Sequence, residues 1–390
     1  MKARKLLMIP GPIEFSPEVM EANGRPTDSH VSPSFIGLFG ESLEMMRKVW
    51  LSPGGQPFIL AGSGTLAMDT AGANLVEPGD NVLVVSTGYF GNRYSELLKR
   101  YGAVVKEINA PLGAVVKTEY IESELSSGKY RMLTFTHVDT STAVLVDPLP
   151  IGALGKKYDV ITVLDGVCSV AGEEIRQDDW GIDVVLTASQ KAIGVPPGLA
   201  LLVVSERAME KWRNRKTPVL NYYADWNNWL PIMQAYEARK PSYFGTPAVN
   251  LVESLNVSLK QIISEGMDAR FERHLRTGRA VRAALNTMGL TQVPLSEDIS
   301  ASTLSAPMYP EGIDGPEFLK AAARAGVIIA GGLHPLIKQD YFRIGHMGIV
   351  NENDLVSTVS AMAQALNETG YKVDTGHAIN AMLKVLNKHM

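Results

Sequence analysis

The hydrophobic positions of the chain fall into short apolar runs that are separated by longer amphipathic stretches. Between about residue 57 and residue 205, six runs of strand length consist mainly of Val, Ile and Leu, and turn signals such as EPGD at 77–80 divide them. Strands that are apolar on both faces are typical of a parallel sheet covered by helices. This part of the chain therefore predicts a large α/β domain with a mostly parallel sheet. The six runs are 81–86, 103–108, 132–138, 160–166, 183–189 and 199–205.

The pattern changes after residue 205. Segment 206–248 is rich in Trp and Tyr and lacks the alternation, and a helix is expected over 249–265. From 266 a second alternation begins, which predicts a smaller α/β domain. Its expected elements are a charged helix at 270–285, a strand around 302–308, a helix at 316–325, and apolar runs at 327–332 and 341–348.

Length and composition agree with a globular protein of two domains. The chain has 390 residues, of which 45% are hydrophobic and 20% charged; such values are typical of a chain with a sizeable core. We expect an N-terminal arm over 1–18, a large domain over 19–265 and a small C-terminal domain over 266–390. The net charge of −4 and the absence of a long basic run exclude a typical nucleic-acid-binding protein.

The location of the protein can be predicted only in outline. No apolar stretch reaches the roughly 18–20 residues that a membrane span needs. The single cysteine, Cys168, excludes an intrachain disulfide and suits a reducing compartment. The expected location is the cytoplasm, with the peroxisome and the mitochondrion left open.

Several polar residues follow the apolar runs directly. Asp165 ends the run at 160–166, Gln190 and Lys191 follow the run at 183–189, and DTST at 139–142 follows the run at 132–138. A lone carboxylate in such a place is more often a turn residue, and a lone lysine is more often a surface charge. In an open parallel sheet, however, ligands bind at the carboxyl ends of the strands, so the joint occurrence of these residues predicts a site there.

A partly desolvated lysine at this edge has a specific chemical use. Burial lowers the pKa of the amine, which can then attack an aldehyde and form a Schiff base. Pyridoxal phosphate supplies such an aldehyde and acts as an electron sink when a carboxylate keeps its ring nitrogen protonated. Lys191 and Asp165, which end two successive runs, could supply the amine and the carboxylate.

The same cofactor also needs a binding site for its phosphate and a face for its ring. Ser63, Gly64 and Thr65 precede a helix that we expect to begin near Leu66. The backbone N–H groups and the dipole of a helix N-terminus favour an anion. After the run at 81–86, Tyr89 and Phe90 are candidates for the aromatic face, although an aromatic residue there is as often part of the core.

The glycine-rich loop has a competing interpretation. GSGTLA at 62–67 fits the G-x-G-x-x-A pattern of dinucleotide-binding proteins. That pattern requires an acidic residue at the end of the next strand, about 20 residues further on, to bind the ribose. The nearest acid, Asp80, precedes that strand. A nicotinamide enzyme is therefore disfavoured, and it would leave Lys191 and Asp165 without a role.

Arg343 in YFRIGHMG is the last candidate. An arginine can bind a carboxylate through two parallel hydrogen bonds. Taken alone, it is more often a structural residue.

Taken together, these residues resemble a known family. The chain resembles the class V aminotransferases of the fold type I pyridoxal-phosphate enzymes, from LLMIPGP at the N-terminus to RIGHMG near the C-terminus. The resemblance implies a mostly parallel seven-stranded sheet between helices, a smaller C-terminal α/β domain, and transfer of the amino group of L-alanine to glyoxylate. The motifs that carry it are AGSGT, VSTGYFG, THVDTSTAVL, VLDGVCS, TASQKAIGVPPG, YFGTP and VIIAGG.

The resemblance implies a role for each candidate around the cofactor. Lys191 would form the Schiff base and shuttle the proton, and Asp165 would pair with the pyridine nitrogen. Phe90 would stack on the ring, where mammalian members of the family have tryptophan. The remaining contacts that the resemblance implies are Ser63, Gly64, Thr65 and Gln190 at the phosphate, with Thr65 in place of a histidine of the mammalian members, and Thr140 beside the ring.

The resemblance also implies a partner and a substrate site. The family is dimeric, and its N-terminal segment typically embraces the partner. Tyr243 and Thr246 would reach the phosphate in the neighbouring subunit, and Arg343 would bind the carboxylate of an amino acid or keto acid. No metal is implied.

Three alternatives stay open on the same fold. The substrates could be those of a serine–glyoxylate, serine–pyruvate or phosphoserine aminotransferase. A cysteine desulfurase is less consistent with the sequence, because Cys168 lies beside a strand end and Gln190 replaces the histidine that commonly precedes the lysine. A non-catalytic protein would leave the combination of Lys191, Asp165 and Arg343 unexplained.

Overall fold

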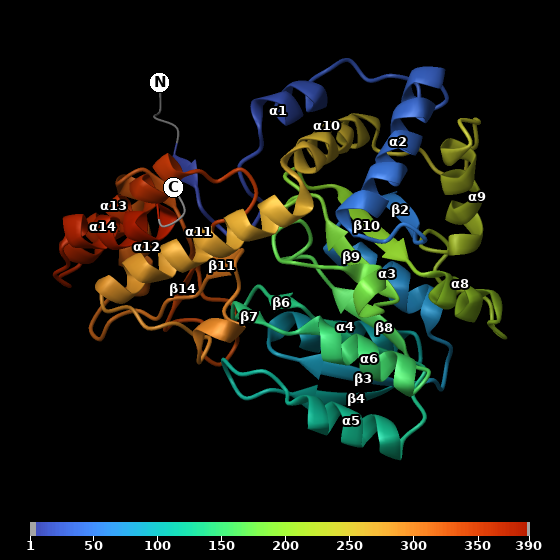
Figure 1. The fold of residues 1–390 in the computed structure, drawn as a ribbon, viewed down its shortest axis with the longest axis horizontal. Coiled ribbons are helices and arrows are strands. Elements are labelled where there is room, and N and C mark those ends of the chain that lie inside the picture. The colour runs from blue at the N-terminus through green and yellow to red at the C-terminus, as the bar shows by residue number, and fades with distance from the viewer. Residues whose placement is uncertain (1–4, 388–390) are drawn as a thin grey trace.

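The computed structural model describes residues 5–387, and its centre is a seven-stranded sheet (Figure 1). Strand β10 is antiparallel to both of its neighbours, and the other strands share one direction. The predicted fold class, α/β with a mostly parallel seven-stranded sheet, is confirmed. Across the sheet the strands follow in the order β2 (Gln56–Ala61), β10 (Leu199–Val204), β9 (Val184–Ala188), β8 (Ile161–Asp165), β5 (Met132–Thr136), β3 (Asn81–Ser86) and β4 (Val104–Asn109).

The strands in the middle of the sheet are those that the apolar runs predict best. Every residue of β5, β8, β9 and β10 is buried. The expectation that the run at 103–108 is buried on both faces is wrong, because β4 is an edge strand and none of its residues is fully buried. The opposite edge is β2, whose apolar residues were not among the six runs. The order of strands in the sheet decides exposure, and that order is not contained in the local pattern.

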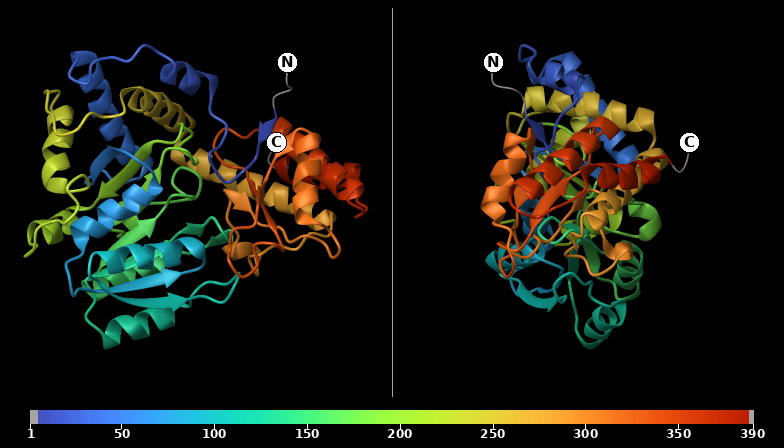
Figure 2. Two further views of the ribbon diagram at one scale, coloured as in Figure 1. Left: turned by 180° about the vertical axis from the view of Figure 1, so that it is seen from behind. Right: turned by 90° about the vertical axis from the view of Figure 1, so that its left-hand side faces the viewer.

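Helices cover the sheet on both faces (Figures 1 and 2). α3 packs on β9 and β10, α4 on β3 and β4, and α6 on β8. α3 begins at Gly64 rather than near Leu66, because Ser63 is the extended residue before the first turn. The helices of this part are α1 (Pro17–Asn23), α2 (Pro33–Val49), α3 (Gly64–Leu75), α4 (Tyr89–Arg100), α5 (Thr118–Ser127), α6 (Pro148–Lys157), α7 (Gln177–Trp180), α8 (Glu206–Arg213), α9 (Trp226–Glu237) and α10 (Val249–Glu265).

The aromatic-rich segment 206–248 contains α8 and α9. Asp225 caps α9 by accepting a hydrogen bond from the backbone N–H of Asn227. Trp226 is buried and stacks on Phe58 of β2, with ring centroids 5.3 Å apart. The tryptophans that interrupt the strand pattern therefore cover one edge of the sheet. The helix predicted over 249–265 is α10, with the same bounds.

A second region of alternating elements follows α10. Its first helix begins at Met267, three residues before the predicted start at 270. Most of its buried side chains form a core of their own, separate from the large core that runs from Val19 to Ile262, and a smaller third cluster joins Leu304 to Val138 of the large region. We propose a domain boundary near residue 265, and the presence of two separate cores supports it. The elements are α11 (Met267–Thr287), the 3-10 helix η1 (Glu297–Ile299), β11 (Leu304–Ser305), α12 (Gly315–Arg324), β12 (Val327–Ile328), β13 (Ala330–Gly331), β14 (Phe342–Gly345), α13 (Glu352–Glu368) and α14 (Thr375–Leu386).

The N-terminal segment joins this second region. Strand β1 (Leu6–Leu7) pairs in parallel with β12, and Met8 is buried in the second core. The blue strand lies beside the orange and red elements in both views of Figure 2. Of the predicted arm over 1–18, residues 1–4 lie outside the described residues, and α1 begins within its last residues.

A short hairpin, β6 (Val138–Asp139) with β7 (Val144–Leu145), lies after β5.

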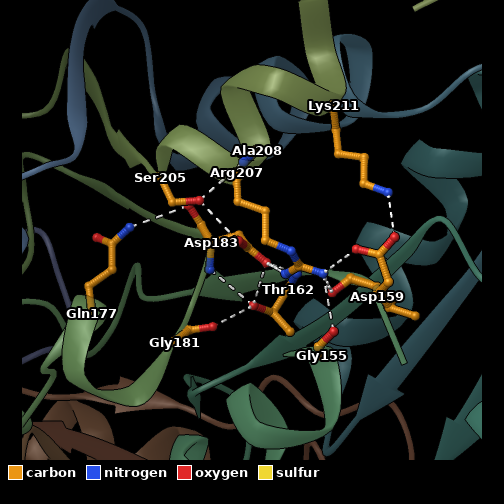
Figure 3. A network of polar contacts seen from close by, with 11 residues as sticks. Gly155, Asp159, Thr162, Gln177, Gly181, Asp183, Ser205, Arg207, Ala208 and Lys211 are labelled. Atoms are coloured by element: carbon orange, nitrogen blue, oxygen red, sulfur yellow. Dashed lines mark hydrogen bonds and ion pairs between the residues drawn. The ribbon is translucent and has the colours of Figure 1, made fainter. Parts of the chain in front are cut away.

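A polar network fixes the amino ends of β8, which ends at Asp165, and of β9, which Lys191 follows (Figure 3). Asp183, just before β9, accepts hydrogen bonds from the backbone N–H of Thr162 at 2.9 Å and from Arg207 Nη1 at 2.6 Å. Arg207 also reaches Asp159 at 3.1 Å. Because these residues join β8, β9 and α8, the two strands are held in register at the end opposite the candidate site.

In the described part of the chain, no helix is both long and apolar enough to cross a membrane.

Candidate active site

A cavity of about 200 Å³ lies at the carboxyl ends of β5, β8 and β9. Residues from six separate stretches of the chain meet there, as the position of strand ends in a parallel sheet would lead us to expect. Eight of the predicted site residues line the cavity: Ser63, Gly64, Thr65, Phe90, Thr140, Asp165, Gln190 and Lys191.

Lys191 lies in the turn that follows β9 and is only 8% exposed. Its Nζ donates a hydrogen bond to the backbone carbonyl of Pro10. Burial lowers the pKa of the amine, and the positive charge of Arg343 lowers it further, whereas Cys168 and Asp165 act in the opposite direction. A larger fraction of the amine is therefore neutral at a given pH than for an exposed lysine, and the neutral form is the one that can attack a carbonyl or accept a proton.

Asp165 is the last residue of β8, on the strand next to that of Lys191, and is 2% exposed. Burial raises the pKa of its carboxyl to about 7, and the negative charge of Asp139 contributes to the rise. The backbone N–H of Val167 donates to its Oδ1 at 3.1 Å and partly opposes the shift. A cation placed beside this carboxyl would keep it ionised.

The start of α3 forms one end of the cavity. Ser63 is the N-cap residue, and within residues 5–387 its side chain makes no capping hydrogen bond. The first backbone N–H groups of this helix, beginning with those of Gly64 and Thr65, can therefore donate hydrogen bonds to an anion. Gln190 lines the same cavity, and the N–H groups of its side-chain amide can donate hydrogen bonds to an anion. This end of the cavity suits a phosphate.

Phe90, in the first turn of α4, is fixed by the loop after β5. Its backbone N–H donates to Asp139 Oδ2 at 2.9 Å, and the backbone N–H of Tyr89 donates to Ser141 Oγ at 3.0 Å. A Cβ on Gly88 would lie 2.6 Å from Ser141 Oγ, so only glycine allows this approach. The loop that carries Thr140 and the aromatic face are thus held together.

Arg343 lies on β14, outside the lining of the cavity. Its Nη1 donates to the carbonyl of Thr140 at 3.2 Å, and its Nε donates to the carbonyl of Gly331 at 2.9 Å. Since Thr140 lines the cavity, the guanidinium is next to the site although it comes from the second region of the chain. Burial lowers its pKa.

Tyr243 and Thr246 are not brought into the cavity within one chain. Both are exposed, Tyr243 to 63%, and the Tyr243 ring lies 5.3 Å from that of His30. Their roles at a partner's site remain a prediction.

Sequence reasoning missed several residues that line the cavity. Gly11 and Arg93 are the most informative of these, and neither was given a role. Gly11 has φ +96°, and a Cβ there would lie 2.5 Å from Lys191 Cδ. The signals were the MIPGP motif for Gly11 and, for Arg93, a position one helical turn after Tyr89 and Phe90. The other lining residues that were missed are Met68, Thr136, Val138 and Val167.

We expect Gly11→Ala to lower turnover at least about tenfold, because the new methyl group must displace the Lys191 side chain and strains a backbone with positive φ. The measurement is steady-state transamination beside a thermal unfolding curve. Gly54→Ala is the control, since a Cβ on Gly54 meets no atom within 4 Å and its φ is not in the positive region. Wild-type turnover in Gly11→Ala would contradict the contact between Gly11 and Lys191.

The donor set fits pyridoxal phosphate. A buried amine of lowered pKa, a buried carboxyl of raised pKa, the N-terminus of α3 and a fixed aromatic residue surround one cavity. Each matches one part of that molecule: the aldehyde, the ring nitrogen, the phosphate and the ring face. Among residues 5–387, no group of His, Cys, Asp and Glu is arranged to hold a metal ion.

Comparisons with known proteins give the family. The profile of the family described as Aminotransferase class-V matches residues 57–354. Alanine–glyoxylate aminotransferase 1 of Saccharomyces cerevisiae is 42% identical over 361 residues, which cover 89% of this chain and 93% of the relative. Serine–glyoxylate aminotransferase of Arabidopsis thaliana is 30% identical, covering 98% of this chain and 96% of the relative.

A solved structure agrees with these sequence relatives. The ureidoglycine–glyoxylate aminotransferase of Bacillus subtilis superposes with a TM-score of 0.93 at 26% identity, covering 100% of this chain and 99% of that one. The chain belongs to the class V aminotransferases, and it is an enzyme whose cofactor is pyridoxal phosphate.

Proposed function

We propose that this aminotransferase moves the amino group of L-alanine to glyoxylate and releases pyruvate and glycine. The observation that carries the proposal is the 42% identity to the yeast alanine–glyoxylate enzyme over 89% of the chain.

Each residue of the site would have one task. Pyridoxal phosphate supplies an aldehyde that carries the amino group and a ring that takes up the electrons of the Cα–H bond. Lys191 would hold the aldehyde in the resting enzyme and, once released, act as the general base for the α-proton. Asp165 would keep the ring nitrogen protonated, and Phe90 would fix the plane of the ring. Lys191 and Asp165 are both buried, at the ends of the neighbouring strands β9 and β8, which supports these roles.

The phosphate and the substrate would occupy opposite ends. Ser63, Gly64, Thr65 and Gln190 would hold the phosphate, supported by the free N-terminus of α3. Arg343 would bind the substrate carboxylate beside Thr140, supported by the hydrogen bond between these two residues.

The competing activities differ in what the site must provide. A desulfurase needs a nucleophilic cysteine on a mobile segment, whereas Cys168 lines the cavity but is 1% exposed and its backbone is held by a hydrogen bond from Thr303. Serine as the donor is supported by the name of the Arabidopsis relative.

The deciding experiment measures transamination for each combination of a donor (alanine, serine, aspartate or phosphoserine) with an acceptor (glyoxylate or pyruvate). Alanine with glyoxylate should give the highest kcat/KM, and a higher value for serine would replace alanine as the donor.

Arg343→Lys should raise the KM for alanine by roughly ten- to a hundredfold and change kcat less, because lysine keeps the charge and loses the two-pronged geometry. Steady-state kinetics over a range of alanine concentrations measure this. If Arg343 only joins the two regions of the chain, the variant should lose thermal stability while its kinetic constants stay at the wild-type values.

We further propose that the enzyme is a dimer in which each site uses Tyr243 and Thr246 of the partner subunit. A two-fold dimer that shares its sites in this way allows complementation. Thr246→Asp places a like charge beside the partner's phosphate, whereas Lys191→Ala destroys the site of its own chain. A mixed dimer of the two inactive variants then has one site with both defects and one sound site.

Random assembly of equal amounts should return about a quarter of the wild-type activity, because about half of the dimers are mixed. Co-expression of the two variants with different tags, followed by double purification, gives the mixed dimer alone. That dimer should show about half of the wild-type activity. An inactive dimer that is folded and carries both tags would mean that the sites are not shared in this way.

A further inference from the structure

The groups proposed to hold the phosphate carry no positive charge. Ser63, Gly64, Thr65 and Gln190 are all neutral, yet a phosphate monoester carries about −1.5 to −2 charges at neutral pH. Among the described residues that line the cavity, the cationic side chains are Lys191 and Arg93. Lys191 points to the carbonyl of Pro10 and is needed for the aldehyde. Arg93 is therefore the remaining source of charge in this lining.

The Arg93 side chain lies at the start of α3. Its Nη1 is 3.5 Å from Thr65 Oγ1, and its Nη2 donates to the Tyr89 hydroxyl at 3.2 Å. The guanidinium carbon is 5.0 Å from the ring centroid of Tyr89 and 5.0 Å from that of Phe90. Contacts of this kind between a guanidinium and aromatic faces are attractive, so the two rings hold the cation in place.

Arg93 keeps donors available for an anion. A guanidinium has five N–H groups, and only two of its nitrogens are engaged in the contacts above. Within residues 5–387, no carboxylate forms an ion pair with it, although other arginines of the chain, such as Arg207 and Arg282, are paired. An unpaired guanidinium beside a helix N-terminus suits a phosphate, which arginine binds through two parallel hydrogen bonds.

We propose that Arg93 binds the cofactor phosphate and supplies the positive charge that Ser63, Thr65 and Gln190 lack. The inference rests on the phosphate site assigned under the proposed function. It adds a second consequence: the guanidinium that neutralises the phosphate also lies on Phe90, so binding of the phosphate fixes the aromatic face of the ring.

The test separates the phosphate from the rest of the cofactor. Apoenzyme is titrated with pyridoxal phosphate and with pyridoxal, which lacks only the phosphate, and bound ligand is measured by absorbance and equilibrium dialysis. Arg93→Gln should weaken the binding of pyridoxal phosphate by roughly ten- to a hundredfold and leave the binding of pyridoxal unchanged. Arg93→Lys should keep part of the preference for the phosphorylated ligand, because it keeps the charge.

Arg100→Gln is the matched control. Arg100 ends the same helix, and its side chain is exposed, so both affinities should equal those of the wild type. Thermal unfolding of the apoenzyme checks that each variant is folded. As a second readout, inorganic phosphate should compete with pyridoxal phosphate less effectively in Arg93→Gln than in the wild type.

Two results would overturn the proposal. Equal weakening of both ligands would mean that Arg93 acts only by holding Phe90, and wild-type affinity for both would mean that it does not reach the phosphate. In either case, a wild-type enzyme that still prefers pyridoxal phosphate keeps the phosphate site of the proposed function intact. A wild-type enzyme that binds the two ligands equally well would instead refute that site, and Arg93 with it.

Discussion

Lys191→Ala should abolish multiple turnover while pyridoxal phosphate still binds. The helix N-terminus, Gln190 and Asp165 remain in place, so the phosphate and the ring keep their contacts. The variant loses both the amine that bonds to the aldehyde and the general base, which together are worth many orders of magnitude in rate. The measurement is steady-state transamination together with an absorbance titration of the apoenzyme.

The spectrum distinguishes this role from a structural one. The wild type should bind the aldehyde covalently and show an absorption band that free pyridoxal phosphate lacks, whereas Lys191→Ala should bind it without that band. Lys48→Ala, at an exposed position of α2, should behave as the wild type. Sustained turnover by Lys191→Ala would refute the assignment of the catalytic lysine.

Asp165→Asn should lower kcat by roughly 10²- to 10³-fold and leave the fold unchanged. The amide is nearly the same size and can still accept the hydrogen bond from the Val167 backbone at its oxygen. It has no negative charge, and the ring nitrogen would no longer be held protonated. Asp179→Asn, at an exposed position, serves as the control. A kcat near that of the wild type would make Asp165 a structural residue.

The same variant has a second signature in the apoenzyme. The pKa of Asp165 is raised to about 7 in the folded state, above the value of about 3.9 in an unfolded chain. Between these two values the folded protein binds more protons, so the free energy of unfolding falls as the pH rises from about 4 to about 7. Asp165→Asn should remove this part of the pH dependence. Thermal unfolding of both apoproteins at pH 4.5 and 7.5 measures it.

The sequence predicts the part of the site that depends on single strands and their ends. Asp165 ends one mainly apolar run and Lys191 follows another, and such runs become neighbouring buried strands. Their meeting at one edge of the sheet then follows from the parallel direction. The helix over 249–265 could also be predicted from the sequence, because its apolar positions repeat with the helical period.

Other features depend on packing that no local pattern contains. Gly11 lies against Lys191 in a segment whose start, β1, pairs with β12 in a distant part of the sequence. The helix α9 escaped prediction because it contains Pro231 and because its tryptophans serve contacts with β2 rather than a simple apolar stripe. Arg93 carried only a weak signal, its position one helical turn after Tyr89 and Phe90, because a charged residue on a helix is usually solvated.

The pairing of β1 with β12 has a consequence for the newly made chain. Leu6 and Leu7 leave the ribosome early, but Val327 and Ile328 are added more than three hundred residues later. At ordinary translation rates this delay is roughly 15 to 65 s. During that time the large sheet can fold, whereas the segment that carries Pro10 and Gly11 has no strand to join. The segment that contacts the turn of Lys191 therefore gains the support of this strand pairing only once Val327 and Ile328 have been synthesised.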